Sequence, residues 1–551
     1  MKRRTNGTRQ VSGGTAAATG KIGRRAVLLA GGAALGLATA GRAQEKSSPQ
    51  DEAAARPNVA YFAIEVVDEQ TGRGVPLVEL QATSGARYYT DSNGLIAFHE
   101  PGLMGKKVFF AVAAHGYEFA PDSFGIRGVA LETKPGGSAR LKIKRINIAE
   151  RLYRLTGQGI YRDTVLLGRK PPISQPLLNA EVTGQDSVLN AVYNNKLYWF
   201  YGDTGRVSYA LGNFAMSGAT TPPPDRLDPA KGFDLNYFTG PDGFSRPMAP
   251  LPGEGVVWLS GISVVPDENG RERMLAYYDR RRGLGEVLES GFMEYDDKSE
   301  RFVKVKEVPP GAPGTPTGHP FLVKHADGTS YLYFTVPYPA LRVRADRASF
   351  LDLAAYESYT CLKPGTRYGD KEKAQLDRDA SGKLVWAWKK NTPPLTAREQ
   401  EELITAGKMR ADETPMRLRD ADSGTAVVVN SASCYWNDYR KKYLLIASEV
   451  LGATVLGEVW YSEADRPEGP WANARKIITH ANKPGDAHDF YNPKQHPYFD
   501  REGGRVIYLE GTYVNTFSGN PHPTPYYEYN QILYRLDLSD PRLRLQGKAG
   551  E

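Results

Sequence analysis

The sequence predicts an all-β protein in which a small β unit precedes a five-bladed β-propeller. Short runs rich in Val, Tyr, Phe and Trp alternate with Gly, Pro and Asn-Gly turns along most of the chain. The chain contains 32 Tyr, a residue type that suits pleated, half-buried surfaces. Residues 150–545 also repeat a pair of strands that is joined by a turn and ends in polar residues.

The first 43 residues predict an export signal. They carry eight basic residues and no acid, and Arg24-Arg25 precede a weakly apolar run from Ala26 to Ala40. That run is too short to span a bilayer, which needs about 20 apolar residues. Small residues for cleavage follow at Ala38 to Ala43. This order is typical of a secretory signal peptide, and the paired arginines favour the twin-arginine route. We expect a periplasmic or extracellular protein; a disordered basic tail is the alternative.

The basic charge of the chain belongs to this segment. The formal net charge is +7, but removing its eight basic residues from the 70 Lys and Arg leaves 62 against 63 Asp and Glu. The remainder has no basic stripe, so we expect no nucleic-acid partner. The two cysteines, Cys361 and Cys434, allow either one disulfide or two buried thiols in an exported protein.

Residues 44–56 are polar and Ala-rich and predict a linker, and residues 57–145 predict a small unit of their own. Its first strand runs from Val59 to Val67, where apolar and polar residues alternate. The phrases Asp68-Glu-Gln-Thr-Gly-Arg-Gly-Val-Pro76 and Thr90-Asp-Ser-Asn-Gly94 mark turns before the next strands. These phrases resemble those of the prealbumin-like (carboxypeptidase regulatory-like) β-sandwich. The resemblance implies a spacer or adhesive module without chemistry of its own.

The repeats of residues 150–545 predict five blades. In each blade a first strand and a turn lead into a second strand: Asp186 to Asp203, Gly255 to Asp279, Gly318 to Thr335, Ala426 to Glu449, and Tyr491 to Glu510. Repeated short sheets at this spacing favour a propeller over an array of β-sandwiches. An insertion separates Arg342 from Arg410, and within it Thr396 to Gly407 predicts a helix that begins at a capping residue.

Two phrases carry a second resemblance. Leu197-Tyr-Trp-Phe-Tyr-Gly-Asp-Thr204 and Glu458-Val-Trp-Tyr-Ser-Glu-Ala-Asp-Arg-Pro-Glu-Gly-Pro-Trp471 are similar to strands of the five-bladed propeller glycosidases. That superfamily includes arabinanases, β-xylosidases, invertases and anhydro-galactosidases. The resemblance implies a carbohydrate-active enzyme whose site lies at the propeller mouth.

Glycoside hydrolysis needs two carboxyl groups, one to protonate the leaving oxygen and one to activate water or attack the sugar. The resemblance places these acids on the first strands of blades one to three. Asp186 matches the base position of blade one, but blade two has no Asp near Trp258, and blade three has His319 in Gly-His-Pro. The acid is therefore His319, as in the anhydro-galactosidases, or a carboxyl from elsewhere such as Glu458 or Glu510.

The candidate residues follow from these positions. The candidates for catalysis are Asp186, Asp203, His319, Glu458 and Glu510. The candidates for substrate binding are Arg162, Tyr201, Trp258, Asn492, His496 and Tyr513. The histidines near residue 488 are too loosely spaced for a zinc site, so no cofactor is expected. A calcium ion in the propeller channel is the alternative, and the sequence carries no signal for it.

Three functions remain open at this stage. The first is a secreted glycoside hydrolase with a polysaccharide or oligosaccharide substrate. The second is a non-catalytic glycan-binding protein, in which the mouth lacks a pair of carboxyls. The third is a lyase, which would place a Tyr hydroxyl beside His319 or His496.

Overall fold

The computed structural model describes residues 59–213, 215–483 and 486–545, and Val59–Glu551 cluster as one compact unit. The predicted signal peptide (1–43) and linker (44–56) lie outside the described residues. Strands far outnumber helices in the described part, which confirms the all-β prediction. None of its helices is long and apolar enough to cross a membrane.

The N-terminal part consists of two four-stranded sheets around a shared core. One sheet has the order β4 (Leu95–Phe98), β1 (Phe62–Asp68), β8 (Ser138–Arg145) and β6 (Tyr117–Glu118). The other has the order β3 (Arg87–Tyr89), β2 (Glu79–Ala82), β5 (Lys107–Ala113) and β7 (Gly128–Glu132). Gly94 has a φ of +74°, and a Cβ there would lie 2.5 Å from the Val66 oxygen. The Asn-Gly turn is therefore a steric requirement.

Five further sheets form the blades of the propeller, each written here from its inner strand outwards. The main sheet of blade one contains β11 (Leu189–Tyr193), β12 (Lys196–Tyr201), β15 (Ser217–Thr221) and β16 (Asn236–Tyr237). Beside it lie β10 (Val182–Gln185), β13 (Thr204–Arg206) and β14 (Tyr209–Asn213). Blade two contains β17 (Val256–Pro266), β18 (Glu272–Arg282), β19 (Glu286–Asp296) and β20 (Arg301–Val308). Blade three contains β21 (His319–Lys324), β22 (Ser330–Thr335), β23 (Pro339–Arg344), β24 (Glu357–Thr360) and β25 (Ala387–Lys390).

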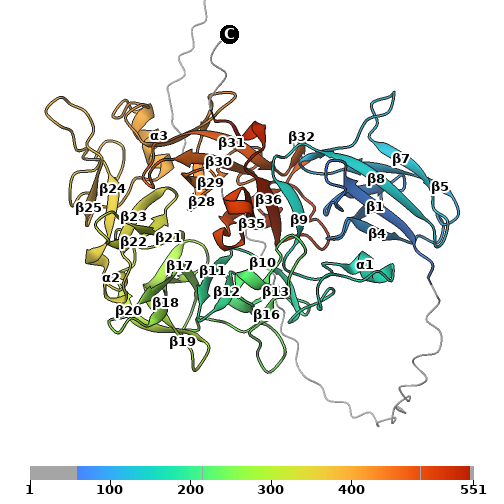
Figure 1. Ribbon diagram of the computed structural model, residues 1–551, viewed down its shortest axis with the longest axis horizontal. Coiled ribbons are helices and arrows are strands. Elements are labelled where there is room, and N and C mark those ends of the chain that lie inside the picture. The colour runs from blue at the N-terminus through green and yellow to red at the C-terminus, as the bar shows by residue number, and fades with distance from the viewer. Residues whose placement is uncertain (1–58, 214, 484–485, 546–551) are drawn as a thin grey trace, which may run out of the picture. The chain divides into compact units, whose positions relative to one another are not determined.

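Blades four and five complete the ring (Figure 1). Blade four contains β28 (Val429–Asn437), β29 (Lys442–Glu449), β30 (Glu458–Ala464), β31 (Trp471–Thr479), β26 (Met416–Asp420) and β27 (Ala426–Val427). Blade five contains β34 (Asp489–Gln495), β35 (Val506–Val514), β36 (Asn530–Asp537) and β9 (Glu150–Arg154). A separate hairpin is formed by β32 (Ala481–Lys483) and β33 (Asp486–Ala487).

Apolar cores between neighbouring blades hold the ring together. One core joins blade one to blade two through Phe200 and Met274, and three others join blades two to three, three to four and four to five. The last core joins blade five back to blade one, with Tyr508 packed near the fully buried Trp199. The aromatic content of the chain is thus used mainly between sheets, where large rings bury much apolar area.

The N-terminal strand of the propeller closes this ring. β9 is the outermost strand of blade five and pairs antiparallel with β36, with Leu533 opposite Tyr153. The first and last segments of the propeller therefore share one sheet.

The helices are few and short. They are α1 (Arg162–Leu166), α2 (Arg347–Phe350) and α3 (Ala397–Thr405), with 3-10 turns η1 (Pro224–Arg226), η2 (Leu353–Ala355), η3 (Pro497–Phe499), η4 (Glu502–Gly504) and η5 (Pro541–Leu543). The helix predicted at Thr396 is confirmed as α3: Thr396 accepts a hydrogen bond from the Glu399 amide, and Glu399 accepts one from the Thr396 amide. Cys361 and Cys434 are both buried and free, so the open question of a disulfide is answered in favour of two thiols.

The sandwich docks on blade five through a buried arginine of β9. Arg151 is 1% exposed and donates to the main-chain oxygens of Pro76 and His115 in the sandwich. It also donates to the hydroxyl of Tyr534 in β36. Further bonds run from the Tyr527 hydroxyl to the Thr90 oxygen (2.7 Å) and from the Ala97 amide to Asp163 (2.8 Å).

Substitution of Arg151 tests this docking. Arg151→Met keeps the apolar stem but leaves the carbonyls of Pro76 and His115 without their donor, so the free energy of unfolding should fall by about 2–4 kcal/mol. Urea unfolding of the mature protein measures this change. Arg398→Met, at a side chain that is 86% exposed, is the matched control and should change little. Equal stability of both variants would show that Arg151 does not hold the two parts together.

Candidate functional site

Asp186 lies at the mouth of the propeller, in the short link between β10 and β11. The Tyr491 hydroxyl of β34 donates to its Oδ2 at 2.8 Å. The amide of Gly202 donates to the Asp186 main-chain oxygen at 2.8 Å, and a Cβ at Gly202 would lie 2.0 Å from Asp186 Oδ1. Only glycine at 202 lets the carboxyl sit this close to the end of β12.

A second carboxyl, that of Asp203, lies near Asp186. It follows the end of β12 and accepts a hydrogen bond from Trp258 Nε1 of β17 at 3.1 Å. Burial raises the pKa of Asp186 to about 6; the bond from Tyr491 opposes this shift and the charge of Asp203 adds to it. Burial also raises the pKa of Asp203, against the hydrogen bond from Trp258. Both carboxyls therefore hold a proton to higher pH than an exposed aspartate does.

Aromatic and amide groups surround this pair. Burial raises the pKa of Tyr529, and the charges of Asp186 and Asp203 raise it further. The Tyr529 hydroxyl therefore lies close to both carboxyls. The ring of Phe517 meets that of Tyr491 edge to face, with centroids 6.3 Å apart. Asn492 donates to the Ser187 hydroxyl at 2.7 Å, next to Asp186 in the chain. The group Asp186, Asp203, Trp258, Tyr491, Asn492, Phe517 and Tyr529 is called the mouth cluster below.

Further along β34 lies a second group of polar residues, all of them buried. Lys494 of β34 is in register with Glu510 of β35, and both side chains are almost fully buried. Lys494 donates to the Tyr435 hydroxyl at 2.7 Å. Burial raises the pKa of Glu510 to about 8, and the charge of Lys494 opposes this shift. Burial lowers the pKa of Lys494 to about 7, against the charge of Glu510.

Two histidines join this group. His496 Nδ1 lies 3.0 Å from the Asn190 amide nitrogen and 3.1 Å from the Tyr498 hydroxyl, and its Nε2 lies 3.5 Å from Glu510. Burial, and then the charge of Lys494, hold the pKa of His319 and of His496 well below the usual value. Both imidazoles are therefore neutral at pH 7. His319, Lys494, His496 and Glu510 are called the axial cluster below, because the first three come from inner strands or their ends.

In and beside the axial cluster, several polar atoms have no hydrogen-bond partner in the described part of the chain. They include both carboxyl oxygens of Glu510, His319 Nδ1 and the hydroxyl of Tyr201. Tyr201 lies close to Glu510, whose charge raises the tyrosine's pKa further after burial has raised it. Unsatisfied buried groups are costly in free energy, so this group is a departure from ordinary core packing.

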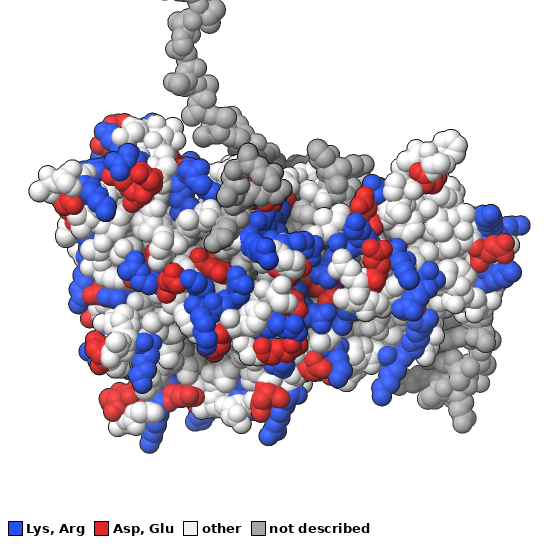
Figure 2. All heavy atoms as spheres, turned by 45° about the horizontal axis from the view of Figure 1, so that its top comes forward, with Lys and Arg blue, Asp and Glu red and all other residues white. Residues whose placement is uncertain are grey.

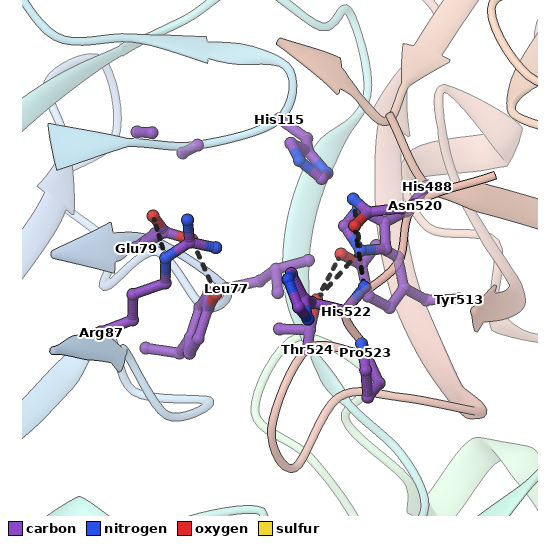
Figure 3. Close-up of a pocket in the computed structure, with 13 residues that line it drawn as sticks. Leu77, Glu79, Arg87, His115, His488, Tyr513, Asn520, His522, Pro523 and Thr524 are labelled. Atoms are coloured by element: carbon purple, nitrogen blue, oxygen red, sulfur yellow. Dashed lines mark hydrogen bonds and ion pairs between the residues drawn. The ribbon is translucent and has the colours of Figure 1, made fainter. Parts of the chain in front are cut away.

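The other predicted residues lie elsewhere. Glu458 is bonded within blade four, to the Thr479 hydroxyl at 2.9 Å and to Lys476 at 3.1 Å. Arg162 of α1 pairs with its neighbour Asp163 at 3.2 Å and lies over the ring of Tyr526. Tyr513 lies against the sandwich, in a pocket with His115 and His488 (Figure 3). These three residues belong to neither cluster.

Sequence reasoning missed several members of the clusters. Tyr491 and Lys494 belong to the phrase Tyr491-Asn-Pro-Lys-Gln-His496, which the sequence marks as polar and aromatic. Their separate roles depend on an irregularity in register between Tyr491 and Lys494, where Asn492 has a φ of +50°. The Asn-Pro pair was the available signal for it.

The described residues offer no ready metal-binding site. Among the described residues, no group of three or more His, Cys, Asp or Glu side chains is arranged to hold a metal ion. Charges of both signs are interspersed on the face shown in Figure 2, which matches the near balance of acids and bases beyond residue 43.

Comparisons with known proteins give only distant similarities. No family model and no curated protein matches the chain. A solved structure of a putative exo-β-1,3-galactanase from Bifidobacterium bifidum is 10% identical, covers 67% of this chain and 92% of its own, and has a TM-score of 0.32. An exo-β-1,3-galactanase from Phanerochaete chrysosporium is 10% identical. The match covers 72% of this chain and 66% of the galactanase chain, with a TM-score of 0.34. An exo-1,5-α-L-arabinanase from a bovine ruminal metagenomic library is 11% identical. The match covers 65% of this chain and 94% of the arabinanase chain, with a TM-score of 0.32. Similarities this low transfer neither an activity nor a residue role.

The unusual protonation of Glu510 makes a testable prediction about stability. Its pKa is raised to about 8 in the folded protein from an ordinary 4.5, so folding becomes less favourable as pH rises from about 4.5 to 8. Glu510→Gln removes this dependence, and the melting temperature of the variant relative to wild type should rise between pH 5 and pH 8. Thermal unfolding across that range measures it, with exposed Glu132→Gln as the control. A difference that falls with rising pH would contradict the neutral state of Glu510.

Proposed function

We propose that this protein is an exported glycoside hydrolase that cleaves an oligosaccharide or polysaccharide at the propeller mouth. The observation that carries the proposal is the pair Asp186 and Asp203, two neighbouring carboxyls with raised pKa values in an aromatic-lined setting. Glycoside hydrolysis uses two carboxyls in different protonation states. The N-terminal pattern of residues 1–43 supports export by the twin-arginine route to the periplasm or the exterior.

Each carboxyl has a distinct role in this proposal. Asp186 is the base, because it precedes an inner strand and a pKa of about 6 leaves it ionised at pH 7 and still able to accept a proton. Asp203 is the proton donor to the leaving oxygen, since burial raises its pKa against the hydrogen bond from Trp258. Trp258 and Tyr491 are positioning residues, which hold the two carboxyls by hydrogen bonds.

The aromatic groups of the mouth cluster suit the binding of a sugar. Trp258, Tyr491 and Tyr529 contact the carboxyls through their polar atoms, and Phe517, whose side chain is 42% exposed, extends the aromatic surface. Rings of this kind offer apolar faces to the C–H groups of a sugar, while amides such as Asn492 serve its hydroxyls.

The remaining candidate residues receive no reacting role. Glu458 is engaged with Thr479 and Lys476, and Glu510 is fully buried beside Lys494. His319 is 8% exposed and neutral at pH 7, which makes it a weak proton donor.

The composition of the inner strands of blades two and three favours a second candidate function, glycan binding without cleavage. The inner strands of blades two and three present Trp258 and His319 where the resemblance leads one to expect acids. A mouth of this composition would bind a sugar without cleaving it. The lyase alternative is less well supported. The Tyr498 hydroxyl lies 3.1 Å from His496, but the imidazole of His496 is fully buried.

Variants of the two carboxyls separate the roles. Asp186→Asn should lower kcat on every substrate by about 10²-fold or more, since the base is lost. Asp203→Asn should do the same on natural glycosides and retain much more activity on a dinitrophenyl glycoside, whose leaving group needs no proton. Release of oligosaccharides and dinitrophenol from a panel of plant, algal and microbial glycans measures both.

Asp279→Asn is the matched control for this experiment. Asp279 lies within β18, the second strand of blade two, and accepts hydrogen bonds from Ser290 and Arg281. If all three variants behaved like wild type, hydrolysis at this pair would be excluded. Retention of glycans without any product would support the binding function instead.

The pH profile gives an independent check. The acidic limb of kcat/KM should lie near pH 6, because activity requires ionised Asp186. The hydrogen bond from Tyr491 lowers the pKa of Asp186, so Tyr491→Phe should move this limb to higher pH. A limb that does not move would exclude Asp186 as the titrating base.

A further inference from the structure

A pocket lies between the sandwich and blade five, with a volume of ≈ 300 Å³ (Figure 3). That size is at the lower end for small-molecule sites, which span roughly 300–1,000 Å³. The sandwich contributes Glu79, Arg87 and Tyr89 from β2 and β3. The propeller contributes His488, Asn520 and His522 from the other side.

The pocket is polar but close to neutral. Arg87 lies 3.6 Å from Glu79, which also accepts a hydrogen bond from the Tyr89 hydroxyl at 2.6 Å. The positive and negative charges on the sandwich side therefore compensate each other. His115 is buried, and this burial holds its pKa well below 6.5, so its imidazole is neutral at pH 7.

The lining offers both hydrogen-bonding groups and flat rings. His115 is 8% exposed, and its Nδ1 has no partner among the described residues. Its ring lies 5.1 Å from that of His488, which stacks on Tyr513 at 5.0 Å. The amide of Asn520 and the hydroxyl of Thr524 border the same space. Donors, acceptors and ring faces together are the features that bind a hydroxyl-rich, uncharged molecule.

One segment of the chain contributes residues to both this pocket and the mouth cluster. Residues 515–529 place Phe517 and Tyr529 near Asp186 and its partner Tyr491, and place Asn520 and His522 in the pocket. Three prolines, Pro521, Pro523 and Pro525, restrict the backbone of the segment. A ligand in the pocket would therefore touch the same segment as a ligand at the mouth.

We infer that this pocket is a second saccharide-binding subsite, which takes a neutral sugar unit and is built jointly by the sandwich and the propeller. The inference rests on the proposed function in that the sugar belongs to the same class of substrate. An acidic sugar is disfavoured because Glu79 already compensates Arg87, the cation on the sandwich side. The sandwich, on this account, is part of the binding surface and more than a spacer.

A pocket-filling variant tests the inference. Ala113 lines the pocket at the end of β5, and Ala113→Trp should occupy its space. Ala111→Trp is the matched control, two residues earlier on the same face of the strand and outside the lining. Both changes are made in the Asp186→Asn background, so that no probe is cleaved, and thermal unfolding confirms that each variant folds. A second variant, His522→Ala, removes one polar group without filling the space.

Calorimetric titration uses trisaccharides of galactose, xylose and arabinose, with a galacturonic acid trisaccharide as the charged comparison. We expect at least one neutral probe to lose roughly tenfold in affinity or more in Ala113→Trp, a smaller loss in His522→Ala, and no change in Ala111→Trp. Equal binding by Ala113→Trp and wild type, preference for the charged probe, or binding of none of the probes would overturn the inference. Because binding is measured without turnover, a protein that binds here but cleaves nothing would refute the proposed hydrolysis alone.

Discussion

The pairing of β9 with β36 closes the propeller, and the rest of the structure depends on that closure. The mouth cluster joins Asp186 to Tyr491, which are 305 positions apart in the chain, so it exists only when blade five lies beside blade one. The same strand carries Arg151, whose bonds to the main chain of Pro76 and His115 hold the sandwich in place. One strand of five residues thus positions both the mouth and the pocket.

Burial of polar groups is the second feature that runs through the molecule. At the mouth, Asp186 and Asp203 are partly buried, which raises the pKa of Asp186 to about 6 and the pKa of Asp203 above its ordinary value. Deeper in, Lys494 and Glu510 are fully buried, and burial shifts both toward their neutral forms. Because only Asp186 and Asp203 are accessible from the mouth, the chemistry is assigned to this pair and not to the buried Lys494 and Glu510.

The sequence predicted the local features well because they depend on local rules. The alternation of strands and turns and the capped helix at Thr396 both follow from short patterns. It could not show which carboxyls meet. Asp203 and Glu458 have similar sequence contexts, at or near strand ends, yet Asp203 lies by Asp186 while Glu458 bonds to Lys476. Likewise, no pattern near Lys494 reveals that its partner is Glu510, because their pairing depends on an irregular register.

We propose that a sugar is cleaved between Asp186 and Asp203. A crystal structure of Asp186→Asn with an oligosaccharide that the wild type cleaves is the decisive measurement. We expect a sugar at the mouth, with a glycosidic oxygen within about 3 Å of the Asp203 carboxyl and a ring against Trp258, Tyr491 or Tyr529. A sugar bound only at other residues, with the mouth cluster free of it, would contradict the claim.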